Sequence, residues 1–207
     1  MLDLPWGLLV LFPIVLLAYM GKLDRIIDSY GISRNAFLWF IAVLLFAGFF
    51  TVNFGVMNTK IYMNIGGFIL PLAALVWLVI IPVYKSRANI FLTALIICIL
   101  YMIVNGMDFL AGMPFFEALA IALPLIVGVV AAMGSGKFSG AIAAVLGGSL
   151  LAELLYYLLL SGMDAAPVWE LGGVRMLNNI ILSAFVSQLI IKIFRRSEVW
   201  QTKGQLD

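Results

Sequence analysis

The sequence has no histidine, a single cysteine (Cys98) and few charged residues, which make up 11% of the chain. Without histidine there is no imidazole to bind a metal ion or to act as an acid or base near neutral pH. One cysteine cannot form a disulfide within the chain. Soluble proteins carry about 25% charged residues. The shortage of charge therefore argues against a soluble enzyme, a disordered chain and a nucleic-acid-binding protein.

Apolar residues make up 65% of the chain, and the mean hydropathy is +1.17. A helix that crosses the hydrocarbon core of a bilayer needs roughly 20 mostly apolar residues. Seven stretches qualify, at about 4–20, 36–55, 65–84, 90–105, 114–133, 139–160 and 173–194. These runs are continuous rather than alternating, so a barrel of strands is not expected. The sequence predicts an all-α polytopic bundle in one integral membrane domain, residues 1–207, with the lipid bilayer as its partner.

The basic residues predict the orientation of this bundle. Ten of the twelve Lys and Arg residues fall in loops on one side, whereas Lys60 alone lies on the other and Arg175 lies inside a predicted span. Basic loops stay in the cytoplasm. We therefore expect a multi-pass protein of the cell membrane, with the N-terminus outside and the C-terminus cytoplasmic. The ten residues are Lys22, Arg25, Arg34, Lys85, Arg87, Lys137, Lys192, Arg195, Arg196 and Lys203.

Two segments with paired glycines suggest an internal repeat. Residues 64–70 (NIGGFIL) open the third predicted helix and residues 170–176 (ELGGVRM) open the seventh. The interpretation is a 3+1+3 parallel plan with repeat A at 1–87, a linker helix at 88–106, repeat B at 107–196 and a cytoplasmic tail at 197–207. Chance similarity between apolar helices is the alternative.

The glycine pairs themselves allow two interpretations. They either let neighbouring backbones pack closely or leave helix N-terminal N–H groups open to an anion. Small residues also recur every fourth position along the sixth predicted helix, a pattern that favours close helix packing. The positions concerned are Gly66, Gly67, Gly172 and Gly173 in the pairs, and Gly140, Ala144, Gly148 and Ala152 in the sixth helix.

Ionisable residues inside membrane spans are costly, so they are candidates for function. Glu153 in the sixth predicted helix and Arg175 in the seventh lie at comparable depth. One hypothesis is a polar centre that binds a small polar solute or an ion; the alternative is a buried ion pair that only sets the helix register. The candidate binding residues are Glu153, Arg175, Asn178, Asn179, Ser149 and Asn64.

Three motifs resemble a known family. Residues 64–71, residues 140–150 with Gly147-Gly148-Ser149, and residues 171–179 are similar in order to the signatures of a bacterial and archaeal multi-pass membrane family known as domain of unknown function 1614. The resemblance covers about residues 50–190 and implies an integral membrane fold without an assigned activity. The family pattern has an Asp in each of the last two motifs, where this chain has Ser149 and Asn178. That departure argues against chemistry with two aspartates.

The leading hypothesis is a non-enzymatic membrane protein that binds or transports a small polar solute or ion. A structural or assembly protein of the membrane is the second possibility, and an intramembrane hydrolase is a more distant third. The sequence assigns no catalytic residue, no cofactor and no metal site, and it predicts no nucleic-acid partner.

Overall fold

A computed structural model describes residues 6–28, 33–56, 59–80, 87–106, 113–135, 137–162 and 168–203. The fold is mostly helical, as the sequence predicts. In chain order its elements are α1 (Trp6–Tyr19), α2 (Asp24–Asp28), α3 (Arg34–Ala47), β1 (Thr51–Val56), β2 (Thr59–Asn64), the π-helical turn η1 (Ile65–Ile69), α4 (Leu70–Ile80), α5 (Arg87–Gly106), α6 (Pro114–Ser135), α7 (Phe138–Gly162), β3 (Val168–Leu171) and α8 (Val174–Lys203).

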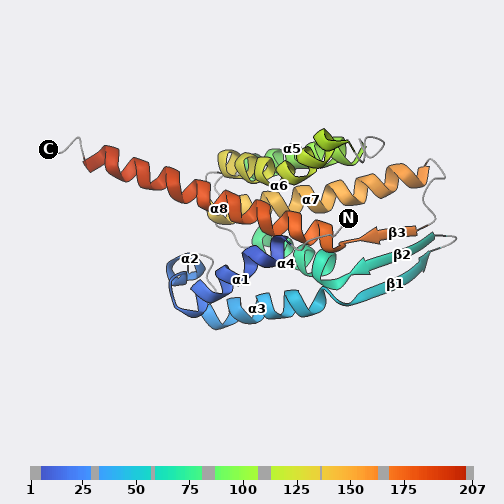
Figure 1. The fold of residues 1–207 in the computed structure, drawn as a ribbon, viewed down its shortest axis with the longest axis horizontal. Helices are drawn as coiled ribbons and strands as arrows, with labels where there is room; N and C mark the ends of the chain where they lie inside the picture. Colours follow the sequence, from blue (N-terminus) through green and yellow to red (C-terminus); the bar gives the residue numbers. More distant parts are fainter. Residues whose placement is uncertain are drawn as a thin grey trace.

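Helices α5 to α8 pack together and hold most of the main hydrophobic core (Figure 1). The most extensive contacts are those of α5 with α7 and of α6 with α8. Gly148 lets α5 and α7 approach closely, because a Cβ atom at this position would lie 2.6 Å from the Ala94 carbonyl oxygen. Ile97, Val127 and Val145 are completely buried between these helices. The α5 to α8 group is the tightly packed part of the described chain.

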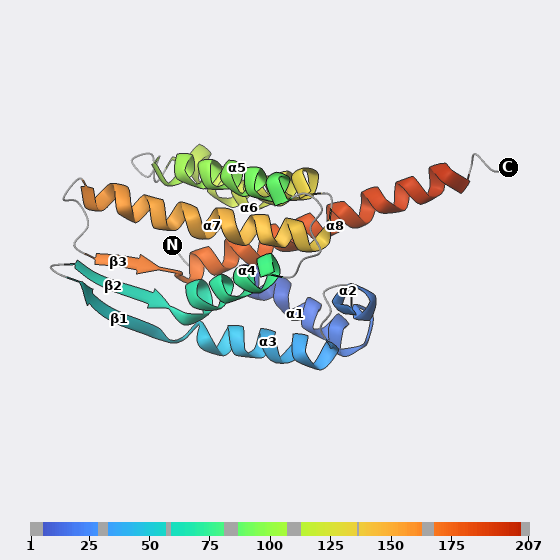
Figure 2. The same cartoon turned by 180° about the vertical axis from the view of Figure 1, so that it is seen from behind.

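Helices α1, α3 and α4 lie on the other side of α7 and α8 (Figure 2). A second, smaller core joins this group to α8, where α1 packs against the long helix and α3 packs against α1. Its buried residues are Leu11, Ile41, Leu44, Leu177 and Ile181. Helix α8 therefore contacts both groups and links the two halves of the chain.

Three helices of the described residues are long and apolar enough to cross a membrane, judged by length and composition. They cover Ala88–Gly106 in α5, Phe138–Leu159 in α7 and Arg175–Phe194 in α8. Shorter apolar helices cover Arg34–Leu44, Ile65–Val79 and Ile121–Ser135. Many large apolar side chains on the outside of these helices are exposed, as a hydrocarbon solvent permits.

A three-stranded sheet departs from the expected all-helical fold. Strands β1 and β2 are antiparallel, with Thr51 opposite Asn64, and β2 pairs in parallel with β3, with Met63 opposite Leu171. The second predicted span, 36–55, is wrong at its end: the helix stops at Ala47 and β1 begins at Thr51. Hydropathy cannot detect this change, because the β-branched and aromatic residues that favour strands are also apolar.

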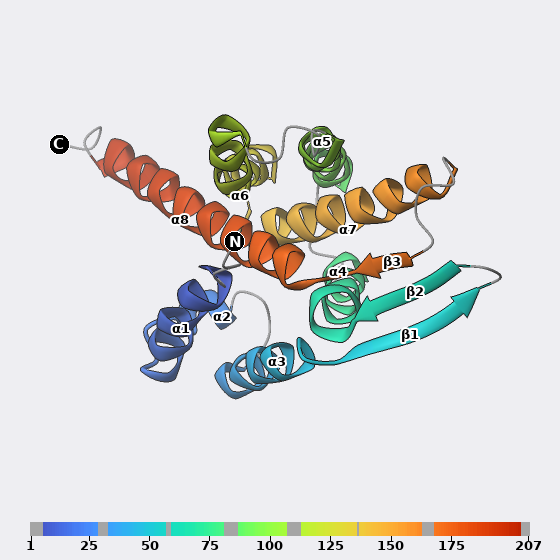
Figure 3. The same ribbon diagram turned by 45° about the vertical axis from the view of Figure 1, so that its right-hand side comes forward.

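The sheet lies at one end of the molecule, beside the second half of α7 (Figure 3). Parallel pairing of β2 with β3 joins chain segments more than 100 residues apart. Each of these two strands leads into one of the double-glycine segments and then into a helix, η1 with α4 in the first case and α8 in the second. The internal repeat itself stays a prediction. Helix α8 also continues to Lys203, so the predicted tail, 197–207, is helical over the part that the structure describes.

Candidate functional site

The two double-glycine segments meet where the sheet passes into the helices. Gly172 has a φ of +80°, a conformation that glycine adopts at little cost. A Cβ atom on Gly67 would overlap the Gly172 carbonyl group, and one on Gly66 would lie 2.7 Å from the Leu44 carbonyl oxygen. Gly173 has nothing within 4 Å of such an atom. Three of the four glycines are therefore required by close backbone packing.

Asn64 stabilises this junction. Its Oδ1 atom accepts a hydrogen bond from the Gly67 N–H at 2.7 Å, which caps the π-helical turn, and its Nδ2 atom donates to the Gly48 carbonyl at 2.8 Å. Both polar ends of the side chain are thus used within the protein. The sequence places Asn64 in the binding centre, whereas the structure places it at a helix cap outside the cavity described below.

Glu153 lies in the middle of α7 and reaches the start of α8. Both of its carboxyl oxygens are 3.0 Å from the Gly172 backbone nitrogen, which donates to them. A carboxyl group is well placed there, because the N-terminal end of a helix carries a partial positive charge. This contact fixes the β3-to-α8 turn against α7.

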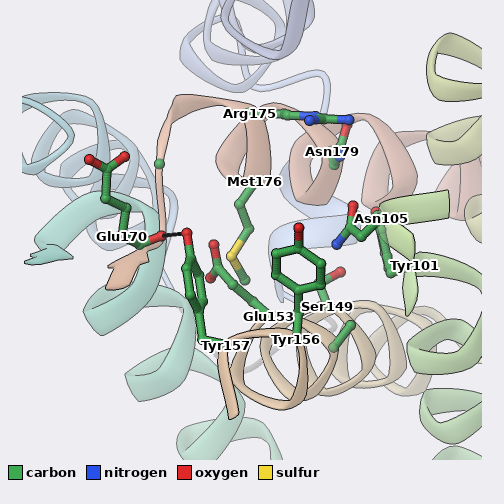
Figure 4. Close-up of a pocket in the computed structure, with 12 residues that line it drawn as sticks. Tyr101, Asn105, Ser149, Glu153, Tyr156, Tyr157, Glu170, Arg175, Met176 and Asn179 are labelled. Atoms are coloured by element: carbon green, nitrogen blue, oxygen red, sulfur yellow. Dashed lines mark hydrogen bonds between the residues drawn. The ribbon is translucent and has the colours of Figure 1, made fainter. Parts of the chain in front are cut away.

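A partly open cavity of about 410 Å³ adjoins the Glu153 side chain (Figure 4). Helices α5, α7 and α8 and strand β3 contribute its walls. The lining residues are Tyr101, Asn105, Ser149, Ala152, Glu153, Tyr156, Tyr157, Glu170, Gly173, Arg175, Met176 and Asn179. A cavity of this size holds a small molecule, and its lining mixes carboxyl, guanidinium, amide and hydroxyl groups with aromatic rings.

Glu153 and Arg175 both line the cavity but do not form an ion pair. The ion pair that the described residues contain joins Arg34 to Asp24, at 3.7 Å and far along the chain from the cavity. The Arg175 side chain is exposed and points away from Glu153 in Figure 4, on the side of Asn179. The alternative of a buried Glu153–Arg175 pair therefore does not match this geometry.

The other predicted residues divide between the cavity and its surroundings. Ser149 and Asn179 line the cavity, as do Glu153 and Arg175. Asn178 does not; its Oδ1 atom is buried and has no hydrogen-bond partner among the described residues. Four of the six candidate binding residues thus come together at one cavity.

The candidate binding residues predicted from the sequence do not include an aromatic wall of the cavity. The Tyr157 hydroxyl donates to the Glu170 carbonyl at 2.9 Å, and the Tyr157 ring stacks on Trp169 with centroids 6.0 Å apart. Tyr101 and Asn105 enter from α5, which the sequence assigns only to a linker helix. Their spacing of four residues places them on one helix face, and this spacing is the feature of the sequence that could have indicated a polar side of α5.

Among the described residues, no group of three Cys, Asp or Glu side chains could hold a metal ion. The polar groups that line the cavity donate and accept hydrogen bonds. Its chemistry suits hydrogen bonding to a solute.

No protein-family model, curated protein or solved structure matches the chain. The resemblance to domain of unknown function 1614 therefore stays a prediction.

Proposed function

We propose that the chain is a multi-pass membrane protein that binds a small polar solute or ion in the cavity between α5, α7 and α8. The observation that carries the proposal is that Glu153 and Arg175 line one partly open cavity without pairing. Because the carboxyl group of Glu153 and the guanidinium group of Arg175 do not bind each other, each can contact a ligand in the cavity. A pair that only set the helix register would close on itself instead.

The proposed orientation places the cavity toward the outer side of the membrane. The exposed edge of β1 carries backbone groups that lipid cannot satisfy, so the sheet belongs in water or among the lipid headgroups. Gly172 and Glu153 lie where the sheet meets the helices. With the basic loops in the cytoplasm, this level is near the outer boundary of the hydrocarbon core, and a solute reaches the cavity from outside.

Seven crossings remain part of the proposal. Helices α1 and α3 each have 14 residues, or about 21 Å at 1.5 Å per residue, which is shorter than a 30 Å core. Local thinning of the bilayer accommodates a helix that is shorter than the hydrocarbon core. The partner of the protein in this account is the lipid bilayer.

A structural role in the membrane is the second candidate, and the Glu153–Gly172 contact favours it. A carboxyl group that holds a helix start contributes to stability whether or not a solute binds. The two functions predict different effects of Glu153→Gln, which replaces the carboxyl group by an amide. The amide of Glu153→Gln keeps an oxygen to accept the Gly172 N–H, so this variant retains most of the structural contact and changes the group that a solute meets.

The test is a panel of amino acids, polyols, small sugars and inorganic ions, added to the purified protein in detergent while its melting temperature is measured. We expect at least one member to raise the Tm of the wild type. Glu153→Gln and Arg175→Met should each lose this response, and Arg175→Lys should keep part of it. Asp28→Asn and Lys192→Met, which change exposed charges away from the cavity, are the matched controls. Wild-type responses in both Glu153→Gln and Arg175→Met would refute the proposal.

A further inference from the structure

The buried polar side chains of the described residues are concentrated on the helices that surround the cavity. Four such residues are buried, and all belong to α5, α7 or α8. They are Thr93, Ser149, Ser183 and Ser187. Burying a hydroxyl group is unfavourable unless it is hydrogen-bonded. Thr93 and Ser187 donate to the carbonyl groups of Asn89 and Ala184 in their own helices, at 2.6 and 2.7 Å. Ser149 and Ser183 have no hydrogen-bond partner of good geometry among the described residues, so the burial of these two hydroxyls calls for a physical reason.

The hydroxyls of Ser149 and Ser183 form a layer next to the cavity together with a third buried hydroxyl, that of Tyr101. The Tyr101 hydroxyl lies beside those of Ser149 and Ser183. The three residues are 5%, 4% and 0% exposed, and none of their hydroxyl oxygens has a hydrogen-bond partner of good geometry in the part of the chain that the structure describes. We call these three residues the hydroxyl layer. Ser149 and Tyr101 also line the cavity (Figure 4), so the layer adjoins it.

Polar residues continue along α8 toward the far end of the bundle. Positions four apart on a helix are neighbours that are offset by about 40°, and α8 carries a polar residue at each of four successive positions of this kind. They form a stripe that turns by about 120° around the helix, and we call this stripe the polar face. Twelve residues of helix separate the first from the last, a distance of about 18 Å. The four residues are Arg175 and Asn179 at the cavity, Ser183 in the hydroxyl layer and Ser187 below it.

The polar face ends beside the first turn of α7. Gln188 follows Ser187, and its Nε2 atom donates to the Phe138 carbonyl at 3.2 Å. Phe138 is the first residue of α7. Polar groups thus extend from the cavity through the core to the opposite end of the bundle.

Close helix contacts shut this face below the hydroxyl layer. Helix α6 packs extensively on α8, and a Cβ atom on Gly128 of α6 would lie 2.8 Å from the Ser183 carbonyl oxygen. The same Cβ atom would lie 2.6 Å from the Cβ of Val186 on α8. The structure therefore has an open cavity on one side and a closed polar face on the other.

We propose that the cavity is the outer entrance of a transport route, and that the solute crosses the membrane along the hydroxyl layer and Ser187 when α8 separates from α6. The inference rests on the proposed solute site and extends it. The hydroxyl layer contains no formal charge to offset the lost hydration of an ion. Its hydroxyls both donate and accept hydrogen bonds. The route fits a small uncharged solute with hydroxyl or amide groups.

Cysteine accessibility tests the route. Cys98→Ala removes the one native thiol, and Ser149→Cys, Ser183→Cys and Ser187→Cys are made singly in that background. A permanently charged methanethiosulfonate reagent, which does not cross bilayers, is applied from either side of sealed vesicles. Labelling is normalised to the thiol content after denaturation. Leu189→Cys, at similar depth and 44% exposed, is the control that faces lipid and should not react.

We expect Ser149→Cys to react from the outer side and Ser187→Cys to react from the opposite side. If Ser149→Cys reacts while Ser183→Cys and Ser187→Cys stay unreactive from both sides, the cavity is a blind pocket; the route is refuted and the proposed binding site stands. If Ser149→Cys itself reacts from neither side, the cavity is not aqueous, and both proposals fail.

Flux measurements test the solute class. Glycerol and rubidium uptake are compared in liposomes that contain Ser183→Cys, before and after the thiol is modified. We expect glycerol uptake that modification abolishes, and rubidium uptake no greater than in liposomes without protein. Rubidium uptake that modification blocks would overturn the assignment of an uncharged solute, as would glycerol uptake that matches empty liposomes.

Discussion

Replacing Glu153 with alanine removes the contact that ties α7 to the start of α8. The Gly172 N–H is buried and donates to both carboxyl oxygens at 3.0 Å. Leaving a buried donor without an acceptor costs about 1–3 kcal/mol. Truncation also removes the packing of the side-chain methylenes, which adds about 1 kcal/mol. We expect Glu153→Ala to lower the free energy of unfolding by about 2–4 kcal/mol.

Glu153→Gln retains one acceptor oxygen, so its loss should be about 1 kcal/mol or less. Glu170→Ala is the matched control. Its side chain is exposed, and the Tyr157 hydroxyl uses its backbone carbonyl, which alanine preserves. A change within about 0.5 kcal/mol is expected there. The assay is equilibrium unfolding in mixed micelles. If Glu153→Ala is as stable as the wild type, the Gly172 contact does not hold the junction and the reasoning is wrong.

Three further predictions concern the same region. Gly67→Ala should destabilise the protein by about 3 kcal/mol or prevent folding, because its Cβ would overlap the Gly172 carbonyl, whereas Gly173→Ala meets nothing within 4 Å and should melt near the wild type. Equal melting temperatures of these two variants would contradict the packing. Tyr157→Phe removes the hydrogen bond to the Glu170 carbonyl and should lower the free energy of unfolding, measured in micelles, by about 1 kcal/mol. Asn64→Ala should lower the free energy of unfolding by about 2 kcal/mol, because it removes the helix cap and a second hydrogen bond. Asn64→Asp should restore the cap, and an Asn64→Asp variant no more stable than Asn64→Ala would contradict this role.

The helical part of the fold could be predicted from the sequence because continuous apolar runs are a strong signal. The runs at 114–133 and 139–160 correspond to α6 and α7 to within a few residues. The sheet could not be predicted in this way. Its strands are only four to six residues long, and β3 is a strand only because it pairs with β2, from which several helices separate it in the sequence.

The candidate site was predictable in part. Depth along two helices placed Glu153 and Arg175 near one another, and the structure brings both to one cavity. Depth alone does not give the direction in which a side chain points, so the Gly172 contact of Glu153 was missed. The same limit applies to Asn64, whose role as a cap depends on the π-helical turn that follows it.

The central claim is that Glu153 takes part in solute recognition at an open cavity. Equilibrium binding of the solute that raises the Tm of the wild type, measured in lipid nanodiscs, tests it most directly. A hydrogen bond to a charged group is worth about 1.5–3 kcal/mol, so Glu153→Gln should weaken binding by about 10- to 100-fold while Lys192→Met binds as the wild type does. Equal affinity of the wild type and Glu153→Gln, with both proteins folded, would contradict the account.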